Sequence, residues 1–154
     1  MGTADRVAAL SVQLIDVHQA LQERLASLRA EAAGNAGAPD DLLSHCLGFC
    51  AAIRTHHTGE DGQLLPALRA AEPSLAPVID KLIEDHGLVA GILQKIGELL
   101  DSESMRAEPA ALARELDGLT AILESHFGFE ERRIGAPLDT LGPGAWSAEV
   151  FAPG

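Results

Sequence analysis

Apolar residues recur every three or four positions along four stretches of this chain, which is the spacing of one face of an α-helix. The stretches cover about residues 5–33, 39–66, 77–100 and 109–134. Each is long enough for several helical turns. The pattern therefore predicts an all-α protein built from four amphipathic helices.

Glycine and proline separate the stretches. Residues 34–37 read Gly-Asn-Ala-Gly before Pro39, and residues 72–74 read Glu-Pro-Ser. A polar segment then precedes Pro109. Pro66 falls inside the second stretch, where we expect it to bend or end the helix. Short connections between long amphipathic helices favour an up-down-up-down antiparallel four-helix bundle.

The end of the chain differs from the rest. Residues after 134 are rich in glycine and proline, so we assign residues 1–134 to the bundle and residues 135–154 to a short C-terminal tail. We expect this tail to pack back through Trp146 or Phe151. The length of 154 residues is enough for a single hydrophobic core, and no internal repeat indicates a second domain.

Composition narrows the function classes. The chain is 47% hydrophobic but only 3% aromatic, which suits a helical core of Leu, Ala, Val and Ile. Its net charge of −12 argues against nucleic acid or an anionic membrane as a partner. No secretory signal or membrane-spanning run is apparent, so we expect a cytoplasmic protein. Cys46 and Cys50 are predicted to be buried, unpaired thiols.

Two of the predicted helices carry a histidine followed four residues later by a glutamate. The pairs are His56–Glu60 and His126–Glu130. On an α-helix this spacing places both side chains on one face, one turn apart. Each pair also lies on the apolar stripe of its helix, so both are predicted to face the core.

The other two helices each add one histidine on the apolar face. His18 lies on the first stripe, and His86 lies on the third with Ile79, Ile83 and Ala90. Counted from the predicted loops, both histidines fall at the depth of the two His–Glu pairs, to within about two residues. A lone histidine on such a stripe is usually a hydrogen-bonded core residue. Four imidazoles and two carboxylates buried together would be very costly without a cation, so we predict a site for two metal ions.

The ligand types narrow the choice of metal. Imidazole and carboxylate groups without thiolates suit iron, manganese or zinc. The Glu-x-x-His motif of ferritin-like di-iron proteins and the His-Glu-x-x-His motif of zinc proteases are both absent from the sequence. Two glutamates shared among histidines from four helices favour a pair of iron ions.

With these features the chain resembles the hemerythrin-like (HHE cation-binding) family. The resemblance covers about residues 10–135, and the residues that carry it are His18, the runs 56–61 and 64–68, Asp85-His86 and the run 126–131. It implies a four-helix bundle around a non-haem di-iron centre. It further implies that His18 and His56 bind one iron, His86 and His126 bind the other, and Glu60 and Glu130 bridge them.

One departure from the family pattern matters. Oxygen-carrying members have a second histidine four residues after the ligand of the third helix, where this chain has Ala90. One iron then has a position open to water, an anion or another side chain. His57 is the first candidate for a ligand at this position, because some hemerythrin-like proteins use the residue after the second-helix histidine as an added ligand. The alternative is that His57 supports the ligands without binding metal, or faces solvent. Asp61 is a weaker candidate, and His45, about 16 Å along the helix from the site, is expected to pack near the bundle end.

The open position favours reaction with O₂, peroxide or NO over stable oxygen carriage. We expect a di-iron protein that binds O₂ or reactive oxygen or nitrogen species, with peroxide decomposition as a candidate activity. The alternative is a non-enzymatic iron or oxygen sensor, and a third hypothesis is a bundle that holds zinc or no metal. The apolar walls of the site are expected to come from Leu14, Ile53, Leu64, Val89, Phe127 and Phe129.

Overall fold

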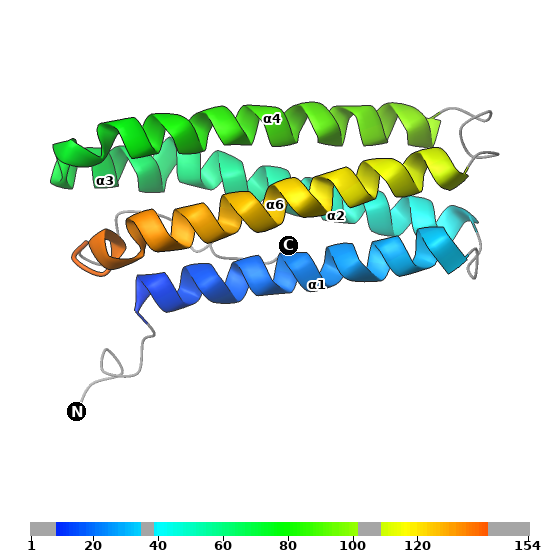
Figure 1. The fold of residues 1–154 in the computed structure, drawn as a ribbon, viewed down its shortest axis with the longest axis horizontal. Coiled ribbons are helices and arrows are strands. Elements are labelled where there is room, and N and C mark those ends of the chain that lie inside the picture. The colour runs from blue at the N-terminus through cyan, green and yellow to red at the C-terminus, as the bar shows by residue number, and fades with distance from the viewer. Residues whose placement is uncertain (1–8, 35–38, 102–108, 142–154) are drawn as a thin grey trace.

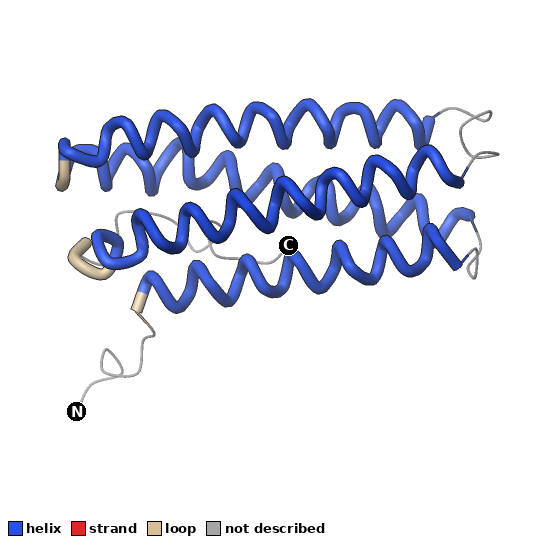
Figure 2. The backbone as a smooth tube through the Cα atoms, viewed as in Figure 1, coloured by secondary structure: helices blue, strands red, loops and turns tan. Residues whose placement is uncertain are grey.

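The computed structural model describes residues 9–34, 39–101 and 109–141. In this part of the chain four long helices lie side by side: α1 (Leu10–Gly34), α2 (Pro39–Gly59), α4 (Ala76–Asp101) and α6 (Pro109–Leu138) (Figure 1). Between α2 and α4 come a π-helical turn, η2 (Glu60–Leu64), the short helix α3 (Leu65–Ala71) and a 3₁₀ turn, η3 (Pro73–Leu75). The described residues contain no strand (Figure 2). The prediction of an all-α helical bundle is confirmed.

Each long helix packs against two others. Helix α1 contacts α2 and α6, and helix α4 contacts the same two helices. This arrangement encloses one hydrophobic core, in which leucines predominate and Phe49 and Phe127 are the largest fully buried side chains. Cys46 and Cys50 are buried and free, as predicted, and burial raises the pKa of the Cys46 thiol to about 12. Among the described helices, none has a segment long and apolar enough to cross a bilayer.

The predicted core stripe of α4 was partly wrong. Ile83 is 40% exposed and Ala90 is also exposed, whereas Leu82 and Val89 are fully buried. The buried positions of this helix follow alternating steps of three and four, as in other packed bundles. The predicted stripe alternates in the same way, but it takes a step of four after residues 79 and 86, where the buried face takes a step of three.

The helix irregularity lies before Pro66 rather than at it. The Leu65 N–H donates to the carbonyl of Glu60, five residues back, and the chain stays helical through α3. In a regular α-helix the proline ring would clash with the carbonyl of Gly62, four residues earlier. The wider π-turn avoids this clash. It also places Glu60 at the first position of the turn, fully buried.

Helix α6 continues past Ile134, the residue at which the sequence pattern predicts the end of the bundle. Leu138, one turn beyond Ile134, is fully buried, so core packing extends the helix through Pro137. The segment expected to form a tail therefore begins as helix. Trp146 and Phe151, which are expected to pack back on the bundle, lie outside the described residues.

The end of α6 caps the start of α1. The carboxylate of Asp139 accepts hydrogen bonds from the backbone N–H of Ser11 (2.9 Å) and from its hydroxyl (2.7 Å). The preceding residue, Ala9, has no side-chain acceptor for the free N–H groups of the first turn. Asp139 supplies that acceptor from the neighbouring helix, and its negative charge suits a helix N-terminus.

Replacing Asp139 with alanine should lower the free energy of unfolding by about 1 kcal/mol, since the first turn of α1 loses its cap. Urea unfolding of the variant and the parent chain measures the difference. Asp117→Ala is the matched control, because it removes an exposed carboxylate of α6 that pairs only with Arg29 in the described ion pairs (2.8 Å). An equal or smaller loss for Asp139→Ala would show that the contact is not a cap.

Candidate metal centre

The core of the bundle contains a cluster of polar side chains. Among the described residues, the buried polar and charged ones are His18, His56, His57, Glu60, His86, His126 and Glu130. They come from α1, α2, the π-turn, α4 and α6. All seven were named as candidate ligands from the sequence, and the structure brings all seven together. We call them the polar cluster.

One half of the polar cluster joins α1 and α2 to the two glutamates. The Nε2 atoms of His18 and His56 lie 3.3 Å apart. His18 Nε2 lies 3.3 Å from Glu130 Oε1, and His56 Nε2 lies 3.6 Å from Glu60 Oε1. One donor atom from each of these four residues lies within 4.8 Å of the other three.

The other half lies between α2, α4 and α6. The Nε2 atoms of His86 and His126 lie 3.1 Å apart. His86 Nε2 is 3.2 Å from Glu60 Oε1. Donor atoms of His57, Glu60, His86 and His126 again lie within 4.8 Å of one another. This is a second compact group of nitrogen and oxygen donors.

The two glutamates connect the halves. Glu60 belongs to both groups of donors. Glu130 reaches His18 with one oxygen (3.3 Å) and His126 with the other (3.4 Å). Two carboxylates placed between two sets of imidazoles form an arrangement suited to two neighbouring cations.

The hydrogen bonding of the cluster is incomplete. Within the described chain, neither oxygen of Glu60 or Glu130 has a hydrogen-bond partner, and neither does Nε2 of His57. A buried carboxylate in this state costs several kcal/mol, which a bound cation would offset. The orphaned atoms are oxygens and an imidazole nitrogen, the donors that iron, manganese and zinc accept. The residues present therefore fit a metal centre.

Protons on the histidines can also balance the charge of the buried carboxylates. Burial lowers the pKa of His18, but the facing Glu130 and Glu131 carboxylates outweigh it and raise that pKa to about 9. For His86, burial is likewise outweighed by Asp61, Glu130 and Glu60, which raise its pKa to about 11. Metal binding requires neutral imidazoles, so a cation would displace these protons.

The two carboxyl groups also differ in their charge. Burial and the adjacent Glu130 raise the pKa of Glu60 well above its ordinary value. For Glu130, burial acts in the same direction, but contacts with Glu60 and three histidines hold the pKa well below its ordinary value. Of the two, Glu130 is therefore the more readily ionised.

Comparison with known families agrees with this geometry. The sequence matches the hemerythrin HHE cation-binding domain family over residues 10–136. The chain belongs to this family. No curated protein and no solved structure shows a significant match. The matched region contains every residue of the polar cluster of this HHE domain.

His57 lies inside the cluster of the HHE domain. Its ring stacks on that of His86, with centroids 3.9 Å apart and planes 13° apart. Burial and the neighbouring His86, His56 and His126 hold its pKa well below its ordinary value, so the ring is neutral. Asp61, the weaker candidate, lies outside both donor groups. Its carboxylate contacts Nδ1 of His86 instead, the ring nitrogen that faces away from the cluster (2.6 Å).

The structure also places Ala90, the residue that stands where oxygen-carrying members have a second histidine. Ala90 is exposed on α4, and Val89 takes the buried position beside it. His57 is the additional imidazole that the structure brings into the cluster.

Apolar residues surround the cluster. The ring of Phe127 stacks on that of His18, with centroids 3.9 Å apart and planes 9° apart. Four of the other expected wall residues are fully buried: Leu14, Ile53, Leu64 and Val89. Phe129 is only partly buried and lies between Lys81 and Arg133, at 5.9 and 5.5 Å from their charged groups. It belongs to the surface and not to the wall.

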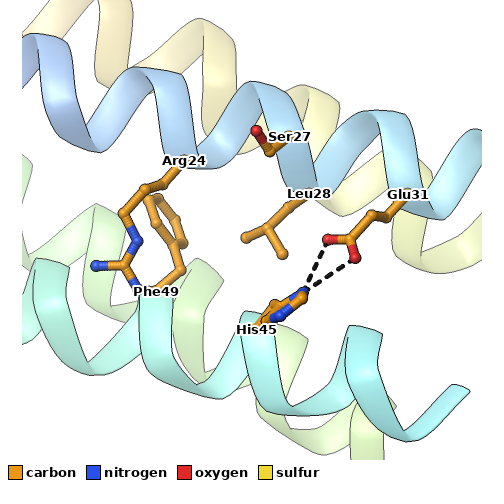
Figure 3. Close-up of a pocket in the computed structure, with 6 residues that line it drawn as sticks. All are labelled: Arg24, Ser27, Leu28, Glu31, His45 and Phe49. Atoms are coloured by element: carbon orange, nitrogen blue, oxygen red, sulfur yellow. Dashed lines mark hydrogen bonds and ion pairs between the residues drawn. The ribbon is translucent and has the colours of Figure 1, made fainter. Parts of the chain in front are cut away.

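His45 takes no part in the cluster. Its Nδ1 lies 3.0 and 3.2 Å from the two carboxylate oxygens of Glu31. Both residues line an open pocket between α1 and α2, together with Arg24, Ser27, Leu28 and Phe49 (Figure 3). As expected from its distance along the helix, His45 belongs to neither group of donor atoms.

Sequence reasoning missed an outer set of carboxylates. Three histidines of the cluster each contact one through Nδ1, the nitrogen that faces away from the cluster centre. The contacts are His18–Glu131 (2.7 Å), His86–Asp61 (2.6 Å) and His126–Asp85 (3.3 Å). Their position in the sequence was a signal, since each carboxylate residue directly precedes or follows a cluster residue.

The raised pKa of His18 predicts a pH dependence for the protein stripped of metal. The stability that this ring contributes by binding its proton is fully present below pH 6.5 and is lost as the pH rises through about 9. The effect is up to roughly 3 kcal/mol. Urea unfolding across this range should show a smaller loss for His18→Gln than for the parent chain. His45→Gln, an exposed histidine, is the control and should follow the parent, whereas equal losses for all three proteins would contradict the assignment.

Proposed function

We propose that this chain is a non-haem di-iron protein of the hemerythrin-like type, which binds O₂ or reactive oxygen or nitrogen species. In this proposal an up-down-up-down antiparallel bundle holds two iron ions in the polar cluster. The observation that supports it best is the pair of buried, unpartnered carboxylates shared between two groups of imidazoles. Zinc and manganese suit the same donors, and metal analysis separates them from iron.

The donor groups suggest how the ligands are divided. His18 and His56 would hold one ion, while His57, His86 and His126 would hold the other. Glu60 and Glu130 would contribute to both ions, because Glu60 belongs to both groups and Glu130 directs one oxygen to each half. These side chains provide fewer donor atoms than two six-coordinate ions take up, so room remains for an external ligand.

A pair of ferrous ions would supply the electrons for O₂, peroxide or NO chemistry. The chain's own residues do the rest. Phe127 and the four buried aliphatic residues around the cluster (Leu14, Ile53, Leu64 and Val89) exclude bulk water from it. The carboxylates balance positive charge, and the neutral ring of His57 adds a donor without adding charge.

One side of the polar cluster borders a surface pocket. A pocket of about 250 Å³ opens between α4 and α6, and it is lined by Lys81, Asp85, Ser125 and the ligand candidate His126. The two other pockets described for this part of the chain are lined by no residue of the polar cluster. Diatomic gases and peroxide are small enough to enter such a space. The chain's charge of −12 also argues against an anionic polymer as the partner.

Loading the protein with ferrous iron without oxygen and then adding O₂, peroxide or NO tests the proposal. We expect two irons per chain and a change in the near-ultraviolet and visible spectrum with at least one of these ligands. Peroxide consumption above that of free iron would add the decomposing activity. The function is contradicted if the spectrum of the iron-loaded protein changes with none of the three ligands and the protein consumes no more peroxide than free iron does.

Replacing His57 with alanine should weaken iron binding by at least about tenfold, since removal even of an outer partner of a ligand costs that much. The spectrum of the loaded protein should change as well. Iron titration against a chelator measures the affinity, and His45→Ala is the control because its side chain lies on the surface. Parent-like affinity and spectrum in His57→Ala would exclude it as a ligand.

The second candidate function is a non-enzymatic sensor of iron or oxygen. The buried carboxylates without hydrogen-bond partners favour it, since metal binding would then add directly to the stability of the bundle. The melting temperature with and without iron discriminates between the two functions. A large rise on iron binding, with no turnover of peroxide, supports the sensor.

A further inference from the structure

The outer carboxylates form a regular set around the polar cluster. Each one comes from a different element than the histidine that it contacts. Glu131 of α6 holds His18 of α1, and Asp85 of α4 holds His126 of α6. Asp61 of the π-turn holds His86 of α4. The same contact is thus made three times, at three different helix–helix seams.

The position of these residues in the sequence explains why they reach the seams. Asp61 follows Glu60, Asp85 precedes His86, and Glu131 follows Glu130. Neighbouring residues on a helix point about 100° apart, because a turn has 3.6 residues. When one side chain points into the core, the next one lies at the edge of the helix and faces an adjacent helix.

The two nitrogens of each imidazole are used differently. The contacts of His18, His86 and His126 with other cluster residues are made by Nε2, and the contacts with the outer carboxylates are made by Nδ1. A carboxylate accepts a hydrogen bond, so it favours a proton on Nδ1. In the neutral ring, this leaves the lone pair of Nε2 pointing into the cluster.

We propose that Asp61, Asp85 and Glu131 are positioning residues, which hold their histidines as Nδ1–H tautomers with Nε2 directed into the cluster. The inference rests on the proposed function only in that the bound ions would use these Nε2 atoms. It assigns these three acidic residues to the metal centre, whereas the sequence pattern left Asp61 only as a weaker candidate for direct coordination. Outer partners of this kind commonly orient metal-bound histidines.

Asp85 is the residue best suited to a test. Its side chain is 13% exposed, compared with 28% for Glu131 and 37% for Asp61. Lys81 donates to its other oxygen (2.9 Å), which fixes the carboxylate with Oδ2 towards His126. The carboxylate is therefore held from both sides, by Lys81 and by His126.

The first measurement uses the protein without metal, so it does not depend on the proposed function. Nitrogen-15 NMR of the His126 ring, at a pH where the ring is neutral, reports which nitrogen carries the proton. We expect Nδ1 in the parent chain and a shift of the population towards Nε2–H in Asp85→Asn and Asp85→Ala, because Nε2 can then donate to Glu130. Asp80→Asn is the control, since it removes an exposed carboxylate of the same helix that pairs with Arg69.

The second measurement is metal affinity, with ferrous iron as the probe and a competing chelator. Asp85→Asn should bind iron about 10- to 100-fold more weakly than the parent chain, and Asp80→Asn should bind like the parent. Asp85→Glu restores a carboxylate and should recover part of the affinity. Circular dichroism confirms that each variant retains its helices before either measurement is interpreted.

The outcomes separate the two proposals. If the parent chain takes up no iron, the proposed function fails, and the NMR result alone decides the role of Asp85. If the parent binds iron and Asp85→Asn has the same affinity and the same His126 tautomer, the positioning role is overturned. A parent chain with its His126 proton on Nε2 would overturn it as well.

Discussion

Two glutamate carboxylates lie in the middle of this bundle, fully buried and without a hydrogen-bond partner among the described residues. Water cannot solvate them there, and the surrounding leucines and phenylalanines cannot replace water. Their charge must be met by protons on the neighbouring histidines or by cations. The raised pKa values of His18 and His86 show the first solution, and metal binding would be the second. The residues that can balance this charge come from all four long helices, so the helices meet at this cluster.

The two halves of the centre are not equivalent. The half between α1 and α2 has two imidazoles, whereas the half nearer α4 has three, because His57 joins His86 and His126. His57 also has no outer carboxylate in the contacts described, and it is held by ring stacking on His86. An ion in the first half would have fewer protein donors than an ion in the second. Unequal coordination of this kind would suit the reactive centre that we propose better than a metal store.

Much of the site could be predicted from the sequence, because it depends on helical periodicity. A four-residue spacing fixes a common face, and loop counting fixes a common depth, so six of the seven cluster residues could be named before their contacts were known. The seventh, His57, was named only from the family resemblance. Other features depend on packing between helices. The sequence pattern placed Ala90 in the core, but packing against the neighbouring helices buries Val89 and leaves Ala90 exposed. The π-turn was also missed, although Gly62 and Pro66 were a signal for it. The outer carboxylates were missed as a set, because acidic residues beside a core position usually face solvent, and their adjacency to cluster residues was the only signal.

The central claim is that two cations bind between Glu60 and Glu130. Anomalous diffraction at the iron absorption edge, from crystals of the iron-loaded protein, tests it directly. We expect two adjacent peaks, one beside His18 and His56 and the other beside His57, His86 and His126. A single peak elsewhere on the protein, or no peak within the polar cluster, would contradict it.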